Sequence, residues 1–296
     1  MDPTAKTQKT VDEWAKMGSY HSVGGHRFFV VDTGGDKAPL VVLHGYPTSS
    51  HDYHRVLPKL AERHRVIIHD HLGFGLSDKP AEYSYSLLEQ TNQAVALWRT
   101  LGVHRAHVVA HDYGTSIATE LIARRNEGDE PIAVTSLTLS NGSIHIELAK
   151  LRFIQKLLRN RLTGPIVARL SSKRVFRSNM RKLWADPSKL GEEDISVMWS
   201  LLTRNQGKHR LHEITQYLRD RVRYWDRWVG ALKACDVPTH VLWGAEDPIT
   251  GGDVARVHHA EIANSTLTLL DGVGHYPMLE TPDRWAEALI GHLPGQ

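Results

Sequence analysis

Short apolar runs alternate with longer stretches of helical periodicity along this chain. Runs rich in Val, Ile and Leu, or in Phe and Thr, predict β-strands at residues 27–31, 39–43, 65–69, 107–110, 135–139, 239–243 and 266–270. Residues 86–101 and 282–293 instead place their apolar side chains at helical spacing. Because strands that alternate with helices favour parallel pairing, this order predicts a doubly wound, mostly parallel α/β sheet.

Two segments depart from this alternation. Asp32-Thr33-Gly34-Gly35 follows the first apolar run and predicts a hairpin turn. From about residue 144 to residue 230 the chain has no strand pattern, and helical stretches interrupted by Gly and Pro follow one another. We therefore expect a core formed by residues 1–140 and 231–296, with a helical block, residues 141–230, inserted between two strands.

The middle of the chain predicts a strand, a tight turn and a helix. The run that ends at Ala110 leads into His111, Asp112, Tyr113 and Gly114, and helical spacing follows. This layout matches the G-x-S-x-G turn that raises a nucleophile above an α/β sheet, with Ala110 in the first glycine position and Asp112 in the serine position. The N-terminus of the next helix would favour a negative charge on Asp112. Because Asp is also a common N-cap, ordinary capping is the alternative role for Asp112.

Three other predicted strands end in polar motifs. They are His44-Gly45-Tyr46-Pro47, Gly244-Ala245-Glu246-Asp247-Pro248 and Gly272-Val273-Gly274-His275-Tyr276-Pro277. Open α/β sheets place their sites outside the carboxyl ends of the strands, so we expect these motifs to meet the central turn at one edge.

The four motifs, in this order, resemble those of the α/β-hydrolase family. Within it they are similar to the aspartate-nucleophile branch, which includes epoxide hydrolases and haloalkane dehalogenases. The resemblance implies the α/β-hydrolase fold, with residues 141–230 as its cap. It also implies Asp112 as the nucleophile, His275 as the base that activates water, and Asp247 as the acid that orients His275.

An aspartate nucleophile indicates attack on a saturated carbon. Aspartate carboxyl groups have an ordinary pKa of about 3.9, so they are ionised at neutral pH and can displace a leaving group without a base. The resemblance places the oxyanion hole at the backbone N–H groups of Tyr46 and Tyr113, where it would stabilise the intermediate formed on Asp112. His44 and His111 flank these positions and are further candidates for contact with the substrate. We expect a small apolar epoxide or halide as the substrate.

The residues that hold the leaving group separate these two reactions. Haloalkane dehalogenases usually have Trp directly after the nucleophile, and this chain has Tyr113 there, which favours an epoxide. By resemblance to epoxide hydrolases, Tyr217 is the cap tyrosine that hydrogen-bonds the epoxide oxygen, with Tyr224 as a weaker candidate; simple packing is the alternative role for Tyr217. The first cap tyrosine of that family has no match, and His145 is the one obvious polar substitute for it.

Two other functions stay open on the sequence alone. One is a haloalkane dehalogenase with an atypical halide pocket, and the other is a catalytically silent family member that binds a ligand or partner through its cap. The cap boundaries, such as Leu139-Ser140-Asn141-Gly142 and Arg227-Trp228-Val229-Gly230, resemble the mesoderm-specific transcript branch of the family. That branch leaves the identity of the reaction open.

Composition excludes several classes of protein. The 296 residues are 41% hydrophobic, which is enough for a large core. Cys235 is the single cysteine, so an internal disulfide is excluded and a reducing compartment fits. The first sixteen residues lack the apolar centre of a signal peptide, and nowhere do 18 apolar residues run together. We expect a cytoplasmic protein without a membrane span, present as a monomer or a homodimer.

The net charge of +3 conceals an asymmetry. Residues 150–230 contain 19 Lys and Arg against 7 Asp and Glu, a net charge of +12. These cations are spread among apolar residues at helical spacing, which is typical of a solvated helical face, so we expect no nucleic-acid partner. Histidine pairs such as His69 and His71 lack the pattern of a zinc site, and we expect neither a metal nor a cofactor.

Overall fold

Eight strands form one sheet in the computed structural model of this protein, which describes residues 2–293. In spatial order the strands are β1 (Ser19–Val23), β2 (His26–Asp32), β4 (Arg65–His69), β3 (Pro39–Leu43), β5 (Arg105–His111), β6 (Ala133–Ser140), β7 (Thr239–Gly244) and β8 (Ser265–Leu270). From β4 to β8 all neighbours are parallel, whereas β1 and β2 run antiparallel. The predicted fold class is therefore confirmed.

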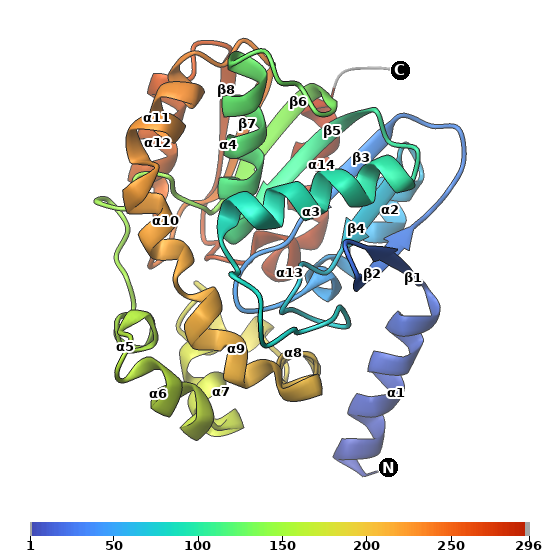
Figure 1. Ribbon diagram of the computed structural model, residues 1–296, viewed down its shortest axis with the longest axis vertical. Helices are drawn as coiled ribbons and strands as arrows, with labels where there is room; N and C mark the ends of the chain where they lie inside the picture. The colour runs from blue at the N-terminus through green and yellow to red at the C-terminus, as the bar shows by residue number, and fades with distance from the viewer. Residues whose placement is uncertain (1, 294–296) are drawn as a thin grey trace.

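Helices cover both faces of the sheet, which explains why the central strands are continuous apolar runs (Figure 1). One face carries α3 (Leu87–Thr100), α4 (Tyr113–Asn126), α11 (Trp225–Lys233) and α12 (Gly252–Glu261), and the other carries α2 (Leu57–Ala61) and α14 (Pro282–His292). The side chains of Val41, Val42, Ile67 and Ile68 are fully buried between these layers. None of the helices described between residues 2 and 293 is long and apolar enough to cross a bilayer.

The first part of the chain differs from the sequence prediction. Residues Asp32 to Gly35 form no hairpin, because β3 pairs with β4 and β5 and not with β2. The hairpin lies one strand earlier, between β1 and β2, where Gly24 and Gly25 adopt positive φ angles of 57° and 82°. Neither β1 nor α1 (Pro3–Lys16) was predicted, because both are polar and lack a clear apolar period.

A set of short helices lies between β6 and β7, and we name residues 141–224 the helical insertion. Its helices are α5 (Phe153–Arg159), α6 (Gly164–Leu170), α7 (Lys173–Arg181), α8 (Glu192–Thr203), α9 (Gly207–Ile214) and α10 (Tyr217–Arg223). Figure 1 shows them gathered at one end of the sheet. The predicted boundary at residue 230 falls within α11, which packs against α4 of the core. The short α13 (Pro277–Glu280) follows the last strand.

Candidate active site

Asp112 occupies a strained turn between β5 and α4. Its φ of 42° and ψ of −102° lie in a region that costs a non-glycine residue about 1–3 kcal/mol. The surrounding backbone is crowded, since a Cβ atom on Gly114 would lie 2.6 Å from the carbonyl oxygen of Leu43. Within the described chain the Asp112 side chain makes no capping hydrogen bond to α4. The turn therefore presents the carboxylate instead of using it as a cap.

The backbone after β3 holds one oxygen of this carboxylate. The Tyr46 N–H donates a hydrogen bond of 3.0 Å to Asp112 Oδ2. Gly45 permits this approach, because a Cβ atom there would lie 3.0 Å from the Asp112 Cβ and 2.6 Å from His111 Nδ1. Tyr113, the other residue predicted for the oxyanion hole, is the first residue of α4, and its ring is fully buried.

His275 and Asp247 form a hydrogen-bonded pair beneath the same edge of the sheet. Asp247 follows β7, His275 follows β8, and Oδ2 of Asp247 lies 2.6 Å from Nδ1 of His275. With Nδ1 occupied, Nε2 is the nitrogen that remains for chemistry. Burial lowers the pKa of His275, but the charges of Asp247 and Asp112 outweigh it and raise that pKa above 6.5. The arrangement is that of a base oriented by an acid.

Asp247 is kept ionised by a dense set of donors. Its Oδ2 accepts from Asn141 Nδ2 at 3.0 Å and from Thr250 Oγ1 at 2.7 Å, and its Oδ1 accepts from the Ile249 N–H at 2.7 Å. Burial opposes ionisation, but the charge and hydrogen bond of His275, together with these donors, lower the pKa of Asp247 to about 2. Asp247 can therefore remain negative while His275 gains a proton.

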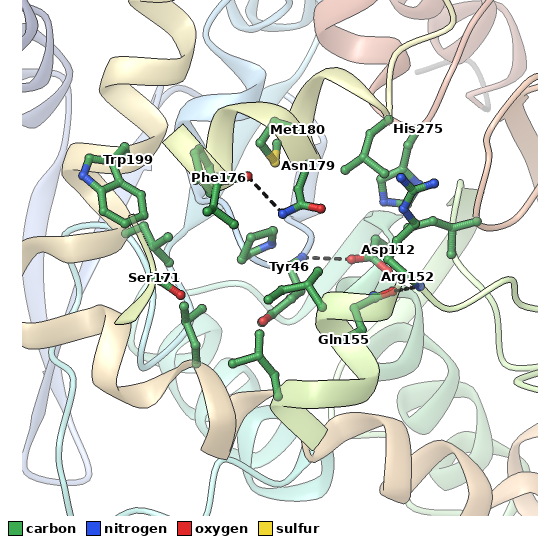
Figure 2. Close-up of a pocket in the computed structure, with 18 residues that line it drawn as sticks. Tyr46, Asp112, Arg152, Gln155, Ser171, Phe176, Asn179, Met180, Trp199 and His275 are labelled. Carbon is green, nitrogen blue, oxygen red and sulfur yellow. Dashed lines mark hydrogen bonds between the residues drawn. The ribbon is translucent and has the colours of Figure 1, made fainter. Parts of the chain in front are cut away.

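A cavity lies above Asp112 and His275 (Figure 2). It is partly open to solvent, and its space, with the open part counted, is about 760 Å³. Most of its wall is apolar and comes from the helical insertion, with Phe176, Met180 and Trp199 among the lining side chains. The polar lining residues are Asp112, Arg152, Gln155, Ser171, Asn179 and His275. A carboxylate at the base of an apolar cavity suits an apolar ligand with one reactive centre.

Tyr217 lies close to the site but behind its wall. Its ring is buried and packs against Tyr46 and Tyr113, with ring centroids 5.6 Å and 5.2 Å away. It is not among the described residues that line the cavity. Gln155 lies between, and its Nε2 is 3.5 Å from the Tyr217 phenol oxygen. Burial and the nearby Asp112 charge raise the pKa of Tyr217, which keeps the phenol protonated as a donor.

The structure places the other two cap candidates outside the cavity wall. Tyr224 is partly buried at the end of α10, where its ring packs 5.4 Å from that of Trp228. His145 is buried and bridges two carboxylates, with its nitrogens 2.7 Å from Glu147 Oε1 and 2.7 Å from Glu261 Oε2. Both therefore make contacts that anchor the helical insertion to the core.

His44 and His111 lie beneath the site and act on its backbone. His44 Nε2 accepts the His71 N–H at 3.1 Å, and burial lowers the pKa of His44, so its ring is neutral. His111 Nε2 lies 2.7 Å from the His275 carbonyl oxygen. Burial and the nearby His275 lower the pKa of His111 to about 4, so Nε2 is the donor of a neutral ring. These contacts fix the loops that carry Tyr46 and His275.

Arg221 was not predicted from the sequence, and it reaches the turn at Asp112 from α10. Its guanidinium donates to the Asp112 carbonyl oxygen at 2.8 Å and to Ser116 Oγ at 2.9 Å. It also lies 3.9 Å from Asp112 Oδ1 and stacks over the Tyr217 ring at 4.8 Å. Arg221 is almost fully buried, so its charge acts directly on the candidate nucleophile.

The sequence contained a weak signal for Arg221 and for Asn141, neither of which was predicted to belong to the site. Arg221 stands one helical turn after Tyr217, so both side chains fall on one face of α10. Asn141 follows β6, another strand end, and adopts a positive φ of 43°. The lining of the cavity carried no such signal, because its residues come from several short helices. No cluster of three or more metal-ligating side chains occurs within residues 2–293.

The fold and site agree with what is known of related proteins. Residues 38–282 match the family model described as alpha/beta hydrolase fold, and the chain belongs to that family. LipZ of Mycobacterium tuberculosis, which is named as a hydrolase, is 37% identical over 97% of this chain and 99% of its own. The mesoderm-specific transcript protein of Mus musculus is 33% identical over 98% of this chain and 90% of its own.

Solved structures show the same fold at lower identity. The haloalkane dehalogenase DbeA-M1 loop variant from Bradyrhizobium elkanii superposes with a TM-score of 0.78 at 22% identity, over 93% of this chain and 95% of its own. The predicted membership of the α/β-hydrolase family and the predicted resemblance to the mesoderm-specific transcript branch are thereby confirmed. The protein is a hydrolase of the α/β fold.

Proposed function

We propose that this protein hydrolyses epoxides of small apolar compounds through an ester formed on Asp112. The observation that carries the proposal is the Asp112 carboxylate itself, which caps no helix in the described chain, contacts the Tyr46 N–H and lies at an apolar cavity. A serine in this position would require immediate deprotonation, whereas a carboxylate can attack saturated carbon directly.

In the first step Oδ1 of Asp112 attacks an epoxide carbon. The C–O bond to the epoxide oxygen breaks, and that oxygen takes a proton to become the first hydroxyl group of the product. Tyr217 is the candidate proton donor, and it would act from behind Gln155, whose amide N–H faces the phenol oxygen. The product of this step is an alkyl ester of Asp112.

In the second step water cleaves the ester. Nε2 of His275 takes a proton from water while the water oxygen attacks the carbonyl carbon of the esterified Asp112. Asp247 stabilises the charge that develops on His275 through their 2.6 Å contact. The Tyr46 N–H, with the predicted N–H of Tyr113, stabilises the tetrahedral oxyanion, an effect typically worth a few kcal/mol. Collapse breaks the bond between the Asp112 carbonyl carbon and the ester oxygen, and that oxygen takes the proton from His275 and leaves as the second hydroxyl group of a vicinal diol. The carboxyl group left on Asp112 gives its proton to the Tyr217 phenolate, directly or through water, which restores both groups.

Arg221 has a positioning role in this scheme. It fixes the Asp112 carbonyl group and Ser116 through two hydrogen bonds, and its charge offsets that of the carboxylate. When Asp112 becomes an ester, the Arg221 charge is no longer balanced by it. The unbalanced charge then opposes protonation of His275, which favours the basic form needed in the second step.

Halide displacement is the second candidate, and two amides in the cavity favour it. Gln155 and Asn179 both line the wall, and each side chain carries N–H groups that can hold a departing halide. The same Asp112, His275 and Asp247 would serve this reaction. The protein then would use amide donors where the dehalogenases named above commonly use tryptophan.

Single-turnover reaction in oxygen-18 water tests the ester. The label should enter the Asp112 carboxylate, which mass spectrometry of the peptide that contains it would detect. An unlabelled Asp112 after product release would exclude the ester route. A panel of styrene-oxide-like epoxides and bromoalkanes then separates the two reactions, since diol release supports the first and halide release the second. A folded protein inactive on both would support a silent binding protein.

A further inference from the structure

Eleven Lys and Arg residues lie between positions 150 and 182, and this segment contains no Asp or Glu. It covers α5, α6 and α7, which Figure 1 shows grouped at the lower left of the view, below the sheet. Among the described residues, Arg177 and Arg181 pair with Glu192, and the other nine cations have no carboxylate partner. The surface therefore carries a concentrated positive charge that the protein itself leaves unbalanced.

The same segment exposes large apolar side chains. Leu162, Ile166 and Leu170 are 84%, 60% and 76% exposed and are spaced four residues apart; Ile166 and Leu170 lie on one side of α6, and Leu162 lies in the turn just before that helix. We name these three residues the α6 stripe. The opposite side of α6 is buried, where Ala168 is inaccessible and a Cβ atom on Gly164 would lie 3.0 Å from His212 Cβ in α9. The stripe thus faces outward by the geometry of the helix.

Apolar side chains bordered by cations fit one kind of partner. Arg161 and Arg169 are exposed next to the stripe, and Lys156 is exposed on α5. Helices of this composition lie in the interface of a bilayer, with the apolar side among the acyl chains and the cations at the phosphates. A second copy of the same face is disfavoured, because it would bring two strongly positive surfaces together. Nucleic acid would bind the cations but would leave the apolar side chains of the α6 stripe without a contact.

The cavity opens close to this surface. Val175 is 46% exposed and also lines the cavity, and a shallow groove beside it includes Phe153, which is 74% exposed. Arg152 borders both the cavity and the two surface grooves next to it. An apolar molecule dissolved in a bilayer under this face would therefore have a short path to Asp112.

We propose that the α6 stripe and the cations around it dock the protein on the surface of bilayers that contain anionic phospholipids. The docking itself does not depend on the reaction proposed for Asp112. It is a peripheral contact, in which the stripe inserts among the acyl chains and the cations bind headgroup phosphates.

Cosedimentation of the whole protein with lipid vesicles tests this proposal. Phosphatidylcholine vesicles that contain phosphatidylglycerol should bind the protein, pure phosphatidylcholine should bind it much less, and added salt should weaken the binding. The triple variant Leu162→Gln/Ile166→Gln/Leu170→Gln should lower vesicle affinity by about tenfold or more. Arg161→Glu/Arg169→Glu should lower it as well, and only for the anionic vesicles.

The matched control is Val222→Gln, which replaces another exposed apolar residue of the helical insertion and should leave vesicle binding unchanged. Thermal melts should show that all variants fold, since every changed side chain is exposed. Equal vesicle binding by the triple variant and the parent would overturn the proposal. So would an absence of binding to anionic vesicles, tight RNA binding that the triple variant retains, or a self-association that the triple variant loses.

Discussion

The sheet and the helical insertion differ in how far their apolar side chains are buried. The central strands bury almost every side chain between two layers of helices. Of the nine large apolar side chains that are exposed among the described residues, seven belong to the helical insertion. Because helices cover both faces of the sheet, the ends of its strands have closely defined positions. Short helices, by contrast, can pack against one another in many arrangements. The sheet therefore fixes the positions of the reacting groups. The helical insertion forms most of the cavity wall and so determines which substrate reaches them.

The same contrast holds for the polar groups. Asp112, Asp247 and His275 come from strand ends, and each has partners in the core. The polar side chains that the insertion adds to the cavity, such as Gln155 and Asn179, lie on its wall and contact neighbours in the insertion itself. Substitutions in the core should thus remove the chemistry, and substitutions in the insertion should adjust it.

The largest effect is expected from Asp112→Ala. Without the carboxylate no ester can form, so turnover should fall by about 10³-fold or more, and no labelled peptide should appear in oxygen-18 water. The measurement is single-turnover mass spectrometry beside steady-state kinetics. Thermal stability should fall, since the variant leaves the Tyr46 N–H and the buried Arg221 charge without this carboxylate. Full activity in this variant would show that Asp112 is not the nucleophile.

His275→Gln should stop the reaction halfway. The ester of Asp112 should form and persist, because no base remains to activate water, and turnover should fall by about 10²–10⁴-fold. Intact-protein mass after mixing with substrate should show the added mass of one substrate molecule. Asp247→Asn is the matched variant and should retain part of the second step. Normal turnover by His275→Gln would disprove the role assigned to that histidine.

Arg221→Met tests a residue by which the helical insertion reaches the turn at Asp112. Removing a buried guanidinium that binds the Asp112 carbonyl and Ser116 should cost about 3–5 kcal/mol of stability and lower kcat by about 10²-fold. Arg221→Lys should restore some stability but less of kcat, because one ammonium group cannot keep both hydrogen bonds. The pH profile of ester hydrolysis distinguishes positioning from mere support. Its acidic limb should move to higher pH in Arg221→Met, and an unmoved limb would assign Arg221 a purely structural role.

The two steps of the reaction should differ in their dependence on pH. His275 must be neutral to take a proton, and Asp247 raises its pKa against the effect of burial. Asp112 carries no charge in the ester, so its share of that increase is absent during ester hydrolysis. Ester hydrolysis should weaken as pH falls through the pKa of His275 in the ester, by about tenfold per pH unit below it. Ester formation should not show this limb. Stopped-flow rates of the two half-reactions would measure both, and Asp247→Asn should shift the limb to lower pH.

Tyr217→Phe should have the smallest effect. The ring is buried among Tyr46 and Tyr113 and the phenol contacts only Gln155 within the described chain, so folding should be almost unchanged. Ester formation with an epoxide should slow by about tenfold if the phenol donates the proton, and halide displacement should be unaffected. Gln155→Leu is the matched variant on the cavity wall. An unchanged epoxide rate in Tyr217→Phe with a reduced rate in Gln155→Leu would assign the donor role to the amide.

The features that could be predicted from the sequence follow the same division. Runs such as 39–43 and 65–69 were recognisable because strands covered on both faces must be apolar throughout. Tyr217 and His145 were assigned by likeness to a family, and the structure puts neither at the cavity wall as described. The turn at Asp32 misled because glycines mark a change of direction and do not state which strand pairs next.

The sequence by itself determined the strands from β2 to β8, the turn at Asp112 and the strand-end positions of Asp247 and His275. These features depend on local sequence patterns, and each such pattern is compatible with few local structures. Only the tertiary structure decided that Arg221 lies under Asp112, that Gln155 separates Tyr217 from the cavity, and that the α6 stripe faces outward. Those contacts join residues distant in the chain, and they depend on how short helices pack, which periodicity alone does not fix.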